Sequence, residues 1–288
     1  MERVTDMAAQ LIDGKVLSLA VKEQLARETA ELKAKGVTPG LVVILVGEDP
    51  GSQIYVRNKE KACQEIGIAS TVLRLNESTT QDELEGLIHK FNADESVDGI
   101  LVQVPLPRHM NEAAALSLIK PEKDVDGFHV VNMGNLFGGM DTIVACTPKG
   151  VMEMIRSTGV NISGKEAVVV GRSNNVGKPI AMLLLQENAT VTMCHSRTKD
   201  LAAHTRRADI LVAAVGRPRF ITGDMIRPGA MVIDVGINRV DGKVVGDVDF
   251  ASASEVASYI SPVPGGVGLM TVAMLMKNTL QIAGKRVK

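Results

Sequence analysis

Residues 165–198 constrain the fold of this chain more than any other stretch. A short β-branched run meets a loop between Gly171 and Gly177, and an apolar-periodic helix and a second β-branched run follow. A strand, a glycine loop, a helix and a strand within about thirty residues predict a βαβ unit of the dinucleotide-binding kind. Ser173 stands where the usual G-x-G-x-x-G pattern has its second glycine, and Gly177 comes one residue late. An ordinary tight turn between strand and helix is therefore the alternative.

The end of the second β-branched run indicates which dinucleotide the loop would hold. NAD-binding units usually carry an acidic residue there, about twenty residues on, that binds the ribose hydroxyls. This chain has His195-Ser196-Arg197 instead, and Arg172 adds a cation in the loop. Arginines and hydroxyls suit a 2′-phosphate, so the predicted cofactor is NADP. Arg197 as a solvated surface charge is the alternative. The candidate cofactor-binding residues here are Gly171, Arg172, Ser173, Val176, Gly177, Ser196 and Arg197.

Composition excludes several other classes of function. The 288 residues suffice for two ordinary domains, and a net charge of −1 gives no footprint for nucleic acid or for a membrane surface. No signal peptide and no bilayer-spanning apolar run is apparent. Cys63, Cys146 and Cys194 are widely spaced and odd in number, which favours a reducing, cytoplasmic location over disulfides. The histidines lack metal-ligand spacing, so no metal is expected.

Strand and helix signals alternate before the glycine loop. Aliphatic runs predict buried strands at residues 41–46, 71–75 and 99–104. Periodicity predicts helices at residues 13–35, 52–66, 80–92 and 111–119. This rhythm predicts a mostly parallel sheet with helices on both faces. We therefore expect a first α/β domain at residues 1–140 and a Rossmann-like domain at residues 141–269, with residues 123–147 as a loop.

The second half of the chain should extend the second sheet. Aliphatic runs at residues 210–215 and 231–235 predict two further parallel strands. Asp241-Gly242 predicts a hairpin that adds antiparallel strands to the edge of this sheet. Residues 270–288 contain a helix that is apolar nearly all round, so we expect it to pack back on the first domain.

Tyr55 and Lys59 are the first candidates for chemistry. They stand four residues apart on a predicted helix and so share one face. That helix begins at the carboxyl end of a parallel strand, where α/β proteins bind ligands. A lysine in apolar surroundings can carry protons at neutral pH. The alternative is a solvated helix face, since Arg57 and Asn58 are also polar.

Gln103 and two aspartates are the next candidates. Gln103 interrupts an apolar run at the end of a predicted buried strand, where its amide needs partners and could orient Lys59. Bonding to the backbone at the strand end is the alternative. Asp124 and Asp126 would lie on one side of an extended segment, and a carboxylate there could accept paired donors from a heterocycle. A turn at Asp126-Gly127 is an equally good interpretation.

Five motifs in one order carry a family resemblance: YVRNK (55–59), VQVPLP (102–107), KDVDGFH (123–129), GRSNNVG (171–177) and PVPGGVG (262–268). Together they resemble the bifunctional methylenetetrahydrofolate dehydrogenase/methenyltetrahydrofolate cyclohydrolase family over nearly the whole chain. The resemblance implies two α/β domains with a cleft between them, the first binding folate and the second NADP, and a homodimer. It implies oxidation of methylenetetrahydrofolate and hydrolysis of the product to 10-formyltetrahydrofolate, a step of one-carbon metabolism.

The resemblance also implies a role for individual residues. Lys59 matches the family's catalytic lysine, and Gln103 matches the amide that positions it. Tyr55 matches the aromatic residue that stacks on folate, and Asp126 the carboxylate that grips the pterin ring. Ile237 matches a contact on the nicotinamide side, and Pro264 and Gly265 are expected to contact the substrate.

Two positions depart from the family pattern. Leu269 stands where the family commonly has proline, which bears on the rigidity of the preceding loop. Val104 stands where leucine is common, a volume change that we expect to be tolerated. Two other functions stay open: another NADP oxidoreductase of the shikimate-dehydrogenase type, and a non-catalytic NADP-binding sensor.

Overall fold

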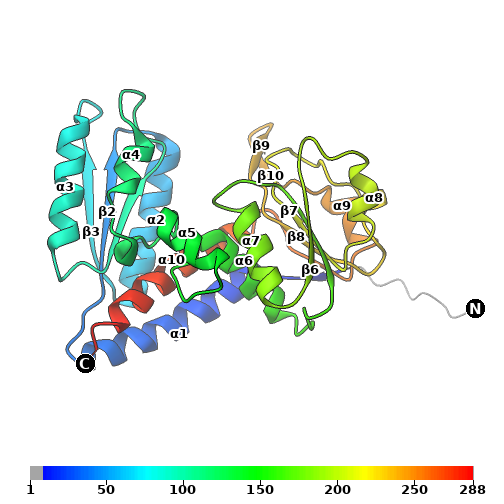
Figure 1. The fold of residues 1–288 in the computed structure, drawn as a ribbon, viewed down its shortest axis with the longest axis horizontal. Coiled ribbons are helices and arrows are strands. Elements are labelled where there is room, and N and C mark those ends of the chain that lie inside the picture. The colour runs from blue at the N-terminus through cyan, green and yellow to red at the C-terminus, as the bar shows by residue number, and fades with distance from the viewer. Residues whose placement is uncertain (1–8, 288) are drawn as a thin grey trace, which may run out of the picture. The chain divides into compact units, whose positions relative to one another are not determined.

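The computed structural model describes residues 9–287, which divide into two compact units (Figure 1). The six-stranded unit contains residues 9–18 and Thr147–Thr271, and the three-stranded unit contains Leu19–Cys146 and residues 272–287. Residues 9–18 thus lie with the second sheet rather than with the first domain, because strand β1 (Gln10–Leu11) pairs in parallel with β11 (Tyr259–Ile260). Residues 1–8 and 288, which the predicted domains included, lie outside the described residues.

The three-stranded unit is built on a parallel sheet in the order β3-β2-β4. Its strands are β2 (Gly40–Val46), β3 (Ala69–Leu75) and β4 (Gly99–Gln103). The central strand β2 is buried at every residue, as its unbroken aliphatic run predicts. Its main helices are α1 (Gly14–Ala34), α2 (Pro50–Ile66), α3 (Gln81–Ala93) and α4 (Glu112–Ser117), of which α1 begins in the other unit. The predicted βαβαβα rhythm is confirmed here.

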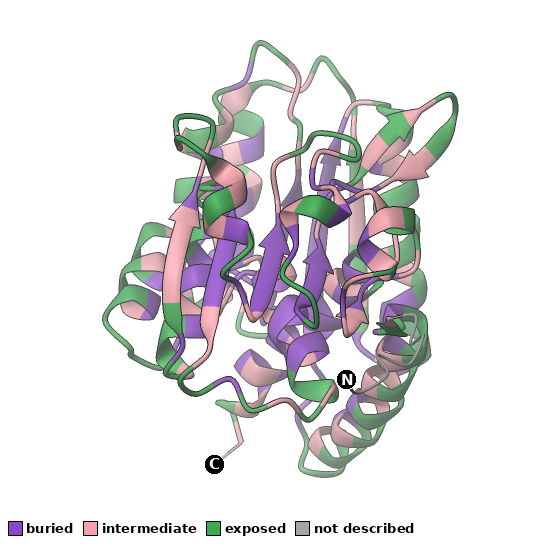
Figure 2. Ribbon diagram, turned by 90° about the vertical axis from the view of Figure 1, so that its right-hand side faces the viewer, coloured by how far each residue is buried: buried purple, intermediate pink, exposed green. Residues whose placement is uncertain are grey.

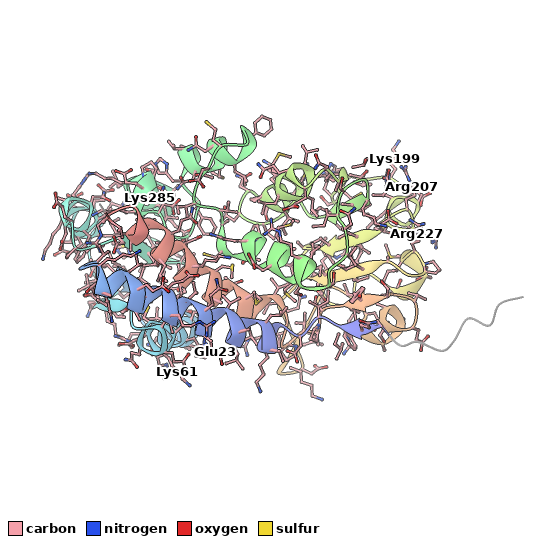
Figure 3. All side chains as sticks on the ribbon, turned by 90° about the horizontal axis from the view of Figure 1, so that it is seen from below. Glu23, Lys61, Lys199, Arg207, Arg227 and Lys285 are labelled. Atoms are coloured by element: carbon pink, nitrogen blue, oxygen red, sulfur yellow. The ribbon has the colours of Figure 1, made fainter. Side chains whose placement is uncertain are left out.

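Local signals explain where these helices begin and end. Asp49 caps α2 by accepting a hydrogen bond from the Ser52 backbone N–H at 2.7 Å, and Gly67 ends the helix with a φ of 89°. Thr80 and Glu83 form a capping box at the start of α3. Glu23 on α1 and Lys61 on α2 are exposed charged side chains, labelled in Figure 3.

The expectation of a loop at residues 123–147 was wrong. This segment holds the helix α5 (Val130–Phe137), while η1 (Pro121–Lys123) ends at its first residue and α6 (Cys146–Ser157) begins at its end. The apolar residues of α5 do not mark its buried face, because Val130 and Phe137 are exposed whereas Asn132 is buried together with Leu136. A hydrophobic pattern does not reveal a helix of this kind.

The six-stranded unit has an all-parallel sheet in the order β1-β11-β8-β7-β5-β6. The strands not yet given are β5 (Glu166–Val170), β6 (Thr190–Cys194), β7 (Ile210–Ala213) and β8 (Met231–Asp234). The predicted βαβ unit is confirmed as β5, α7 (Gly177–Gln186) and β6. Strands β7 and β8 are buried at every residue, like the other strands drawn in purple in Figure 2. The short helices α8 (Leu201–Thr205), η2 (Gly223–Met225) and α9 (Phe250–Ser254) complete the unit.

The predicted hairpin forms, but its predicted place was wrong. Strands β9 (Asn238–Val240) and β10 (Lys243–Val245) pair with each other in a separate two-stranded sheet. Asp241 and Gly242 turn between them with positive φ angles of 51° and 75°, as such a tight hairpin requires. Strand β8, which precedes the hairpin, already pairs with β7 and β11, so neither of its edges is open to another strand.

The last helix, α10 (Val267–Gly284), is largely buried, as its apolar composition predicts. From residue 272 onward it belongs to the three-stranded unit. There the Asn278 amide donates hydrogen bonds to the carbonyl oxygens of Val125 and Val144 at 2.8 and 2.9 Å. Over residues 9–287, no helix is long and apolar enough to cross a membrane.

Candidate functional site

Lys59 and Gln103 meet at the carboxyl end of the three-stranded sheet. Gln103 is the last residue of β4, and Lys59 lies on α2, the helix that follows the neighbouring strand β2. Lys59 Nζ donates a hydrogen bond to Gln103 Oε1 at 2.9 Å, and Gln103 Nε2 donates to the Val104 carbonyl oxygen at 2.7 Å. Both interpretations of the buried amide therefore hold at once. The backbone contact fixes the orientation of the carboxamide, and its oxygen faces the amine.

Asp126 is electrostatically coupled to Lys59. Burial raises the pKa of Asp126 from 3.8 to about 6, the Lys59 charge partly opposes this rise, and Asp124 adds to it. A carboxyl with such a pKa changes its charge just below neutral pH. Lys59 thus interacts both with the Gln103 amide and, through its charge, with the Asp126 carboxyl group.

Asp124, unlike Asp126, holds the backbone of a turn in place. Its side chain is buried and accepts hydrogen bonds from the backbone N–H groups of Gly127 and His129 and from the Asn132 amide. These bonds close a turn, so the expectation of an extended segment with both aspartates on one side was wrong. Gly127 has a φ of 72°, and a Cβ there would lie 2.5 Å from the Ala145 nitrogen. The turn prediction was the correct interpretation.

Tyr55 stands one helical turn before Lys59 on α2. Its side chain is exposed, whereas the next residue, Val56, is fully buried. Tyr55 therefore contributes little to the core and presents an aromatic ring to solvent. In a chain with only two tyrosines, an exposed ring beside the Lys59 turn suits stacking against a flat ligand.

A pocket of about 410 Å³ lies at the carboxyl ends of β5, β6 and β7 in the six-stranded unit. It is lined by Val170, Gly171, Arg172, Ser173, His195, Ser196, Thr198, Leu201, Ala214, Val215, Arg217 and Phe220. Two glycines shape it. Gly171 has a φ of 139°, and a Cβ there would lie 2.2 Å from the Ala214 carbonyl oxygen, while a Cβ at Gly177 would lie 2.3 Å from the Gly171 oxygen. The turn after β5 is thus too tight for a side chain at either position.

The start of α7 has one weakly bonded backbone donor. Val176 precedes the helix, and its side chain makes no capping hydrogen bond. The Gly177 N–H makes only a long bond, 3.4 Å, to Ser173 Oγ, whereas the Lys178 N–H donates to the Ser173 carbonyl oxygen at 3.1 Å. The weakly bonded Gly177 N–H and the positive dipole end of the helix favour a bound phosphate.

Of the two cofactor-binding residues predicted after β6, Ser196 and Arg197, one lines the pocket. His195 and Ser196 line the pocket, whereas Arg197 is exposed and is not among the lining residues. The Arg197 backbone N–H donates to His195 Nδ1 at 3.1 Å. Sequence analysis missed Arg217 and Phe220. The glycine at 216, directly after an aliphatic strand, was the signal for a ligand-binding turn.

The remaining predicted residues lie together in the six-stranded unit. Pro264 is exposed, and Gly265 has a φ of 107°, which favours glycine. Ile237, between β8 and β9, is also exposed. A Cβ at Gly268 would lie 3.5 Å from Ile237 Cδ1, so Ile237 adjoins the loop that carries Pro264 and Gly265.

Among the residues that the structure describes, no group of three or more His, Cys, Asp or Glu side chains could hold a metal ion. Of the candidate residues, Lys59, Gln103 and Asp126 lie in the three-stranded unit, while the phosphate-suited pocket and the loop that carries Pro264 and Gly265 lie in the six-stranded unit.

Comparison with known proteins agrees with this division. Residues 12–126 match the profile of the tetrahydrofolate dehydrogenase/cyclohydrolase catalytic domain, and residues 145–287 match that of the NAD(P)-binding domain of the same family. The bifunctional protein FolD of Acetivibrio thermocellus is 58% identical over 283 residues, covering 98% of this chain and 99% of that protein.

Solved structures give the same result. The bifunctional FolD enzyme from Campylobacter jejuni superposes with a TM-score of 0.94 at 50% identity, covering 97% of this chain and all of that one. The Trypanosoma brucei FolD, solved with NADP and an inhibitor, has a TM-score of 0.91 at 44% identity, with 97% and 99% of the two chains covered. The chain belongs to the tetrahydrofolate dehydrogenase/cyclohydrolase family.

Proposed function

We propose that this protein oxidises methylenetetrahydrofolate to methenyltetrahydrofolate with NADP, and then hydrolyses the methenyl compound to 10-formyltetrahydrofolate. The observation that carries the proposal is the contact between Lys59 and Gln103 beside Asp126. Family membership supports these two activities over those of a shikimate-dehydrogenase-type enzyme. The three-stranded unit binds the folate, and the six-stranded unit binds the cofactor.

Lys59 manages the proton of the hydrolytic step. Gln103 Oε1 accepts a hydrogen bond from the amine and so fixes the position of the nitrogen that exchanges the proton. Water attacks the methenyl carbon, and one proton of the water passes to Lys59 Nζ. The bond between this carbon and one of its two nitrogens then breaks, that nitrogen takes the second proton of the former water, and the carbon keeps the oxygen as the formyl group. Gln103 holds the amine in place without adding an anion that could trap the methenyl cation.

Asp126 and Tyr55 bind the folate. The ionised Asp126 carboxylate accepts paired hydrogen bonds from the amino and N–H groups of the pterin ring. The exposed ring of Tyr55 stacks on a flat part of the substrate. Pro264 and Gly265 supply further substrate contacts from their loop. The pKa of Asp126, about 6, leaves the carboxylate mostly ionised at neutral pH.

The pocket in the six-stranded unit fits NADP. The tight turn at Gly171 and Gly177 lets backbone N–H groups approach a phosphate, and no acidic side chain lines the pocket. NADP, when bound, supplies the acceptor for the hydride. The residues that hold it are Gly171, Arg172, Ser173, Val176, Gly177, Ser196, Arg197 and Ile237.

We also propose that the protein acts as a homodimer in the cytoplasm. Large apolar side chains that are exposed on and after α5 support a partner surface, namely Val130, Val131, Phe137 and Met140. Sedimentation analysis tests this proposal, since a monomer at micromolar concentration would contradict it.

The test of function replaces Lys59. We expect Lys59→Met to abolish hydrolysis of methenyltetrahydrofolate while NADP binding survives, because Lys59 lies outside the cofactor pocket. Lys61→Met is the matched control on the same helix, since Lys61 is exposed and pairs with Glu65 at 3.8 Å. Hydrolysis that persists in Lys59→Met would remove this lysine from the role.

A second assay follows nicotinamide reduction with methylenetetrahydrofolate and either NADP or NAD. Turnover with NADP supports the proposed reaction. Turnover with NAD alone would keep the reaction but contradict the proposed phosphate contacts. Absence of turnover with both cofactors would favour the non-catalytic sensor.

A further inference from the structure

We propose that Arg217, which the sequence did not single out, acts with Arg172 to select NADP by binding its 2′-phosphate. This inference rests on the proposed use of NADP and goes beyond it, because it names the specificity-determining residue. Both arginines line the pocket at the carboxyl ends of β5, β6 and β7. They approach it from different strands, Arg172 after β5 and Arg217 after β7.

The Arg217 side chain is held in place by an aromatic ring. Its guanidinium carbon lies 4.1 Å from the centre of the Phe220 ring, and Phe220 lines the same pocket. Stacking on a ring occupies a face of the guanidinium plane and leaves its N–H edges available. Those edges match the oxygen atoms of a phosphate, which two N–H groups of one arginine can bind together.

The backbone at Arg217 is fixed by a buried carboxylate. Asp247 is fully buried and accepts hydrogen bonds from the consecutive backbone N–H groups of Val215, Gly216 and Arg217 at 2.6, 2.9 and 2.9 Å. The Asn238 amide donates a further bond to Asp247 at 2.9 Å. Asp247 is therefore a positioning residue, and the turn that carries Arg217 is preorganised before any ligand binds.

Arg172 and Arg217 differ from other arginines of the six-stranded unit in their partners. Arg206, Arg207 and Arg227 each pair with a carboxylate, and the latter two are labelled in Figure 3. Over residues 9–287, neither Arg172 nor Arg217 has a carboxylate within ion-pair distance. Two guanidinium groups without acidic partners that border one pocket constitute a site for an anion.

Arg197 is the competing candidate, since the sequence pattern assigned the 2′-phosphate to it. Its neighbours Ser196 and Thr198 line the pocket, but Arg197 does not. In contrast to Arg217, it has no aromatic ring that holds its guanidinium in the described structure. The geometry favours Arg217 over Arg197 as the cation that binds the 2′-phosphate together with Arg172.

The test measures cofactor binding by calorimetry, without turnover. We expect Arg217→Gln to weaken NADP binding about tenfold or more, the loss typical of a hydrogen bond to a charged group, and to leave NAD binding unchanged. The NADP affinity of Arg217→Lys should lie between those of the wild type and Arg217→Gln, because lysine keeps the charge but lacks the planar guanidinium group. Arg207→Gln is the matched control and should leave both affinities unchanged, because Arg207 pairs with Glu166 and does not line the pocket.

A fragment experiment isolates the phosphate. Adenosine 2′,5′-bisphosphate should lose affinity for Arg217→Gln, whereas adenosine 5′-monophosphate should not. The substitution should not disturb the fold, because the Arg217 side chain is exposed and Asp247 holds only its backbone. Far-UV circular dichroism verifies this.

Three results would overturn the proposal. Equal loss of NADP and NAD binding would show that Arg217 contacts a part common to both cofactors. A selective loss in Arg197→Gln without one in Arg217→Gln would return the role to Arg197. A wild-type protein that binds NAD but not NADP would overturn the proposed cofactor itself, and this inference with it.

Discussion

Asp126→Asn should stabilise the protein while weakening its binding of folate. The pKa of Asp126 rises from 3.8 to about 6 in the folded state because the surrounding protein desolvates the charged form of its carboxyl group. The rise is about two pH units, and each corresponds to about 1.4 kcal/mol, so ionised Asp126 costs up to about 3 kcal/mol of folding free energy. Because the side chain is partly exposed, we expect about 2 kcal/mol after solvent screening.

The pH dependence follows from the direction of this pKa change. Between the unfolded pKa of 3.8 and the folded pKa of about 6, the folded wild-type protein binds more protons than the unfolded one. Its stability therefore falls as pH rises through this range and stays lower above it. Asparagine does not titrate, so the gain in Asp126→Asn should be near zero below pH 3.8 and fully present above pH 6.

Urea unfolding at pH 5 and pH 8 measures this gain in the free energy of unfolding. The chain has no tryptophan, so far-UV circular dichroism is used to follow the transition. Asp124→Asn is the matched control. It should destabilise the protein by about 2 kcal/mol, because Asp124 is buried and accepts three hydrogen bonds that an amide cannot all replace. A loss of stability in Asp126→Asn at pH 8, or a gain independent of pH, would refute the argument.

The same variant tests function, because a carboxylate retained at a cost in stability suits a binding role. Folate affinity of the wild type should fall as pH drops below about 6, the pKa of Asp126, and Asp126→Asn should lack this dependence. An unchanged folate affinity in the variant would separate Asp126 from substrate binding.

Two further predictions follow from close contacts. In Gly177→Ala, the new Cβ would lie 2.3 Å from the Gly171 oxygen, so the loop must shift. Cofactor affinity, measured by titration, should therefore fall about tenfold or more. The contact between Lys59 and Gln103 should remain. In Arg286→Met, the buried Asp98 carboxylate loses a guanidinium that contacts it at 2.8 Å. That variant should lose about 3 kcal/mol at pH 8 in urea unfolding. The loss should be smaller at pH 4, because burial raises the pKa of Asp98 and removal of the guanidinium takes away a group that lowers it, so proton uptake by the unpaired carboxylate is favoured. An equal loss at both pH values would contradict this.

The sequence alone predicted the elements whose signals are local. The aliphatic run of β2 predicted a strand buried on both faces, and Gly171 with Gly177 predicted the turn into α7. Both signals are local, because the spacing of apolar residues and the requirement for glycine in a tight turn are properties of short segments. The same locality explains why α5 was missed, since the burial of its polar residue Asn132 depends on a hydrogen bond to Asp124, which lies outside the helix.

Tertiary structure alone decided which distant side chains act on one another. Spacing placed Lys59 on a helix face and Gln103 at a strand end, but only the pairing of β4 with β2 brings the amine within 2.9 Å of the amide. The raised pKa of Asp126 likewise depends on burial, which no local pattern encodes. Arg217 joins the pocket because β7 pairs with β5, a neighbour remote in sequence. Local propensities follow from the chain itself, whereas strand order, burial and the resulting charge environment exist only once the sheets have assembled.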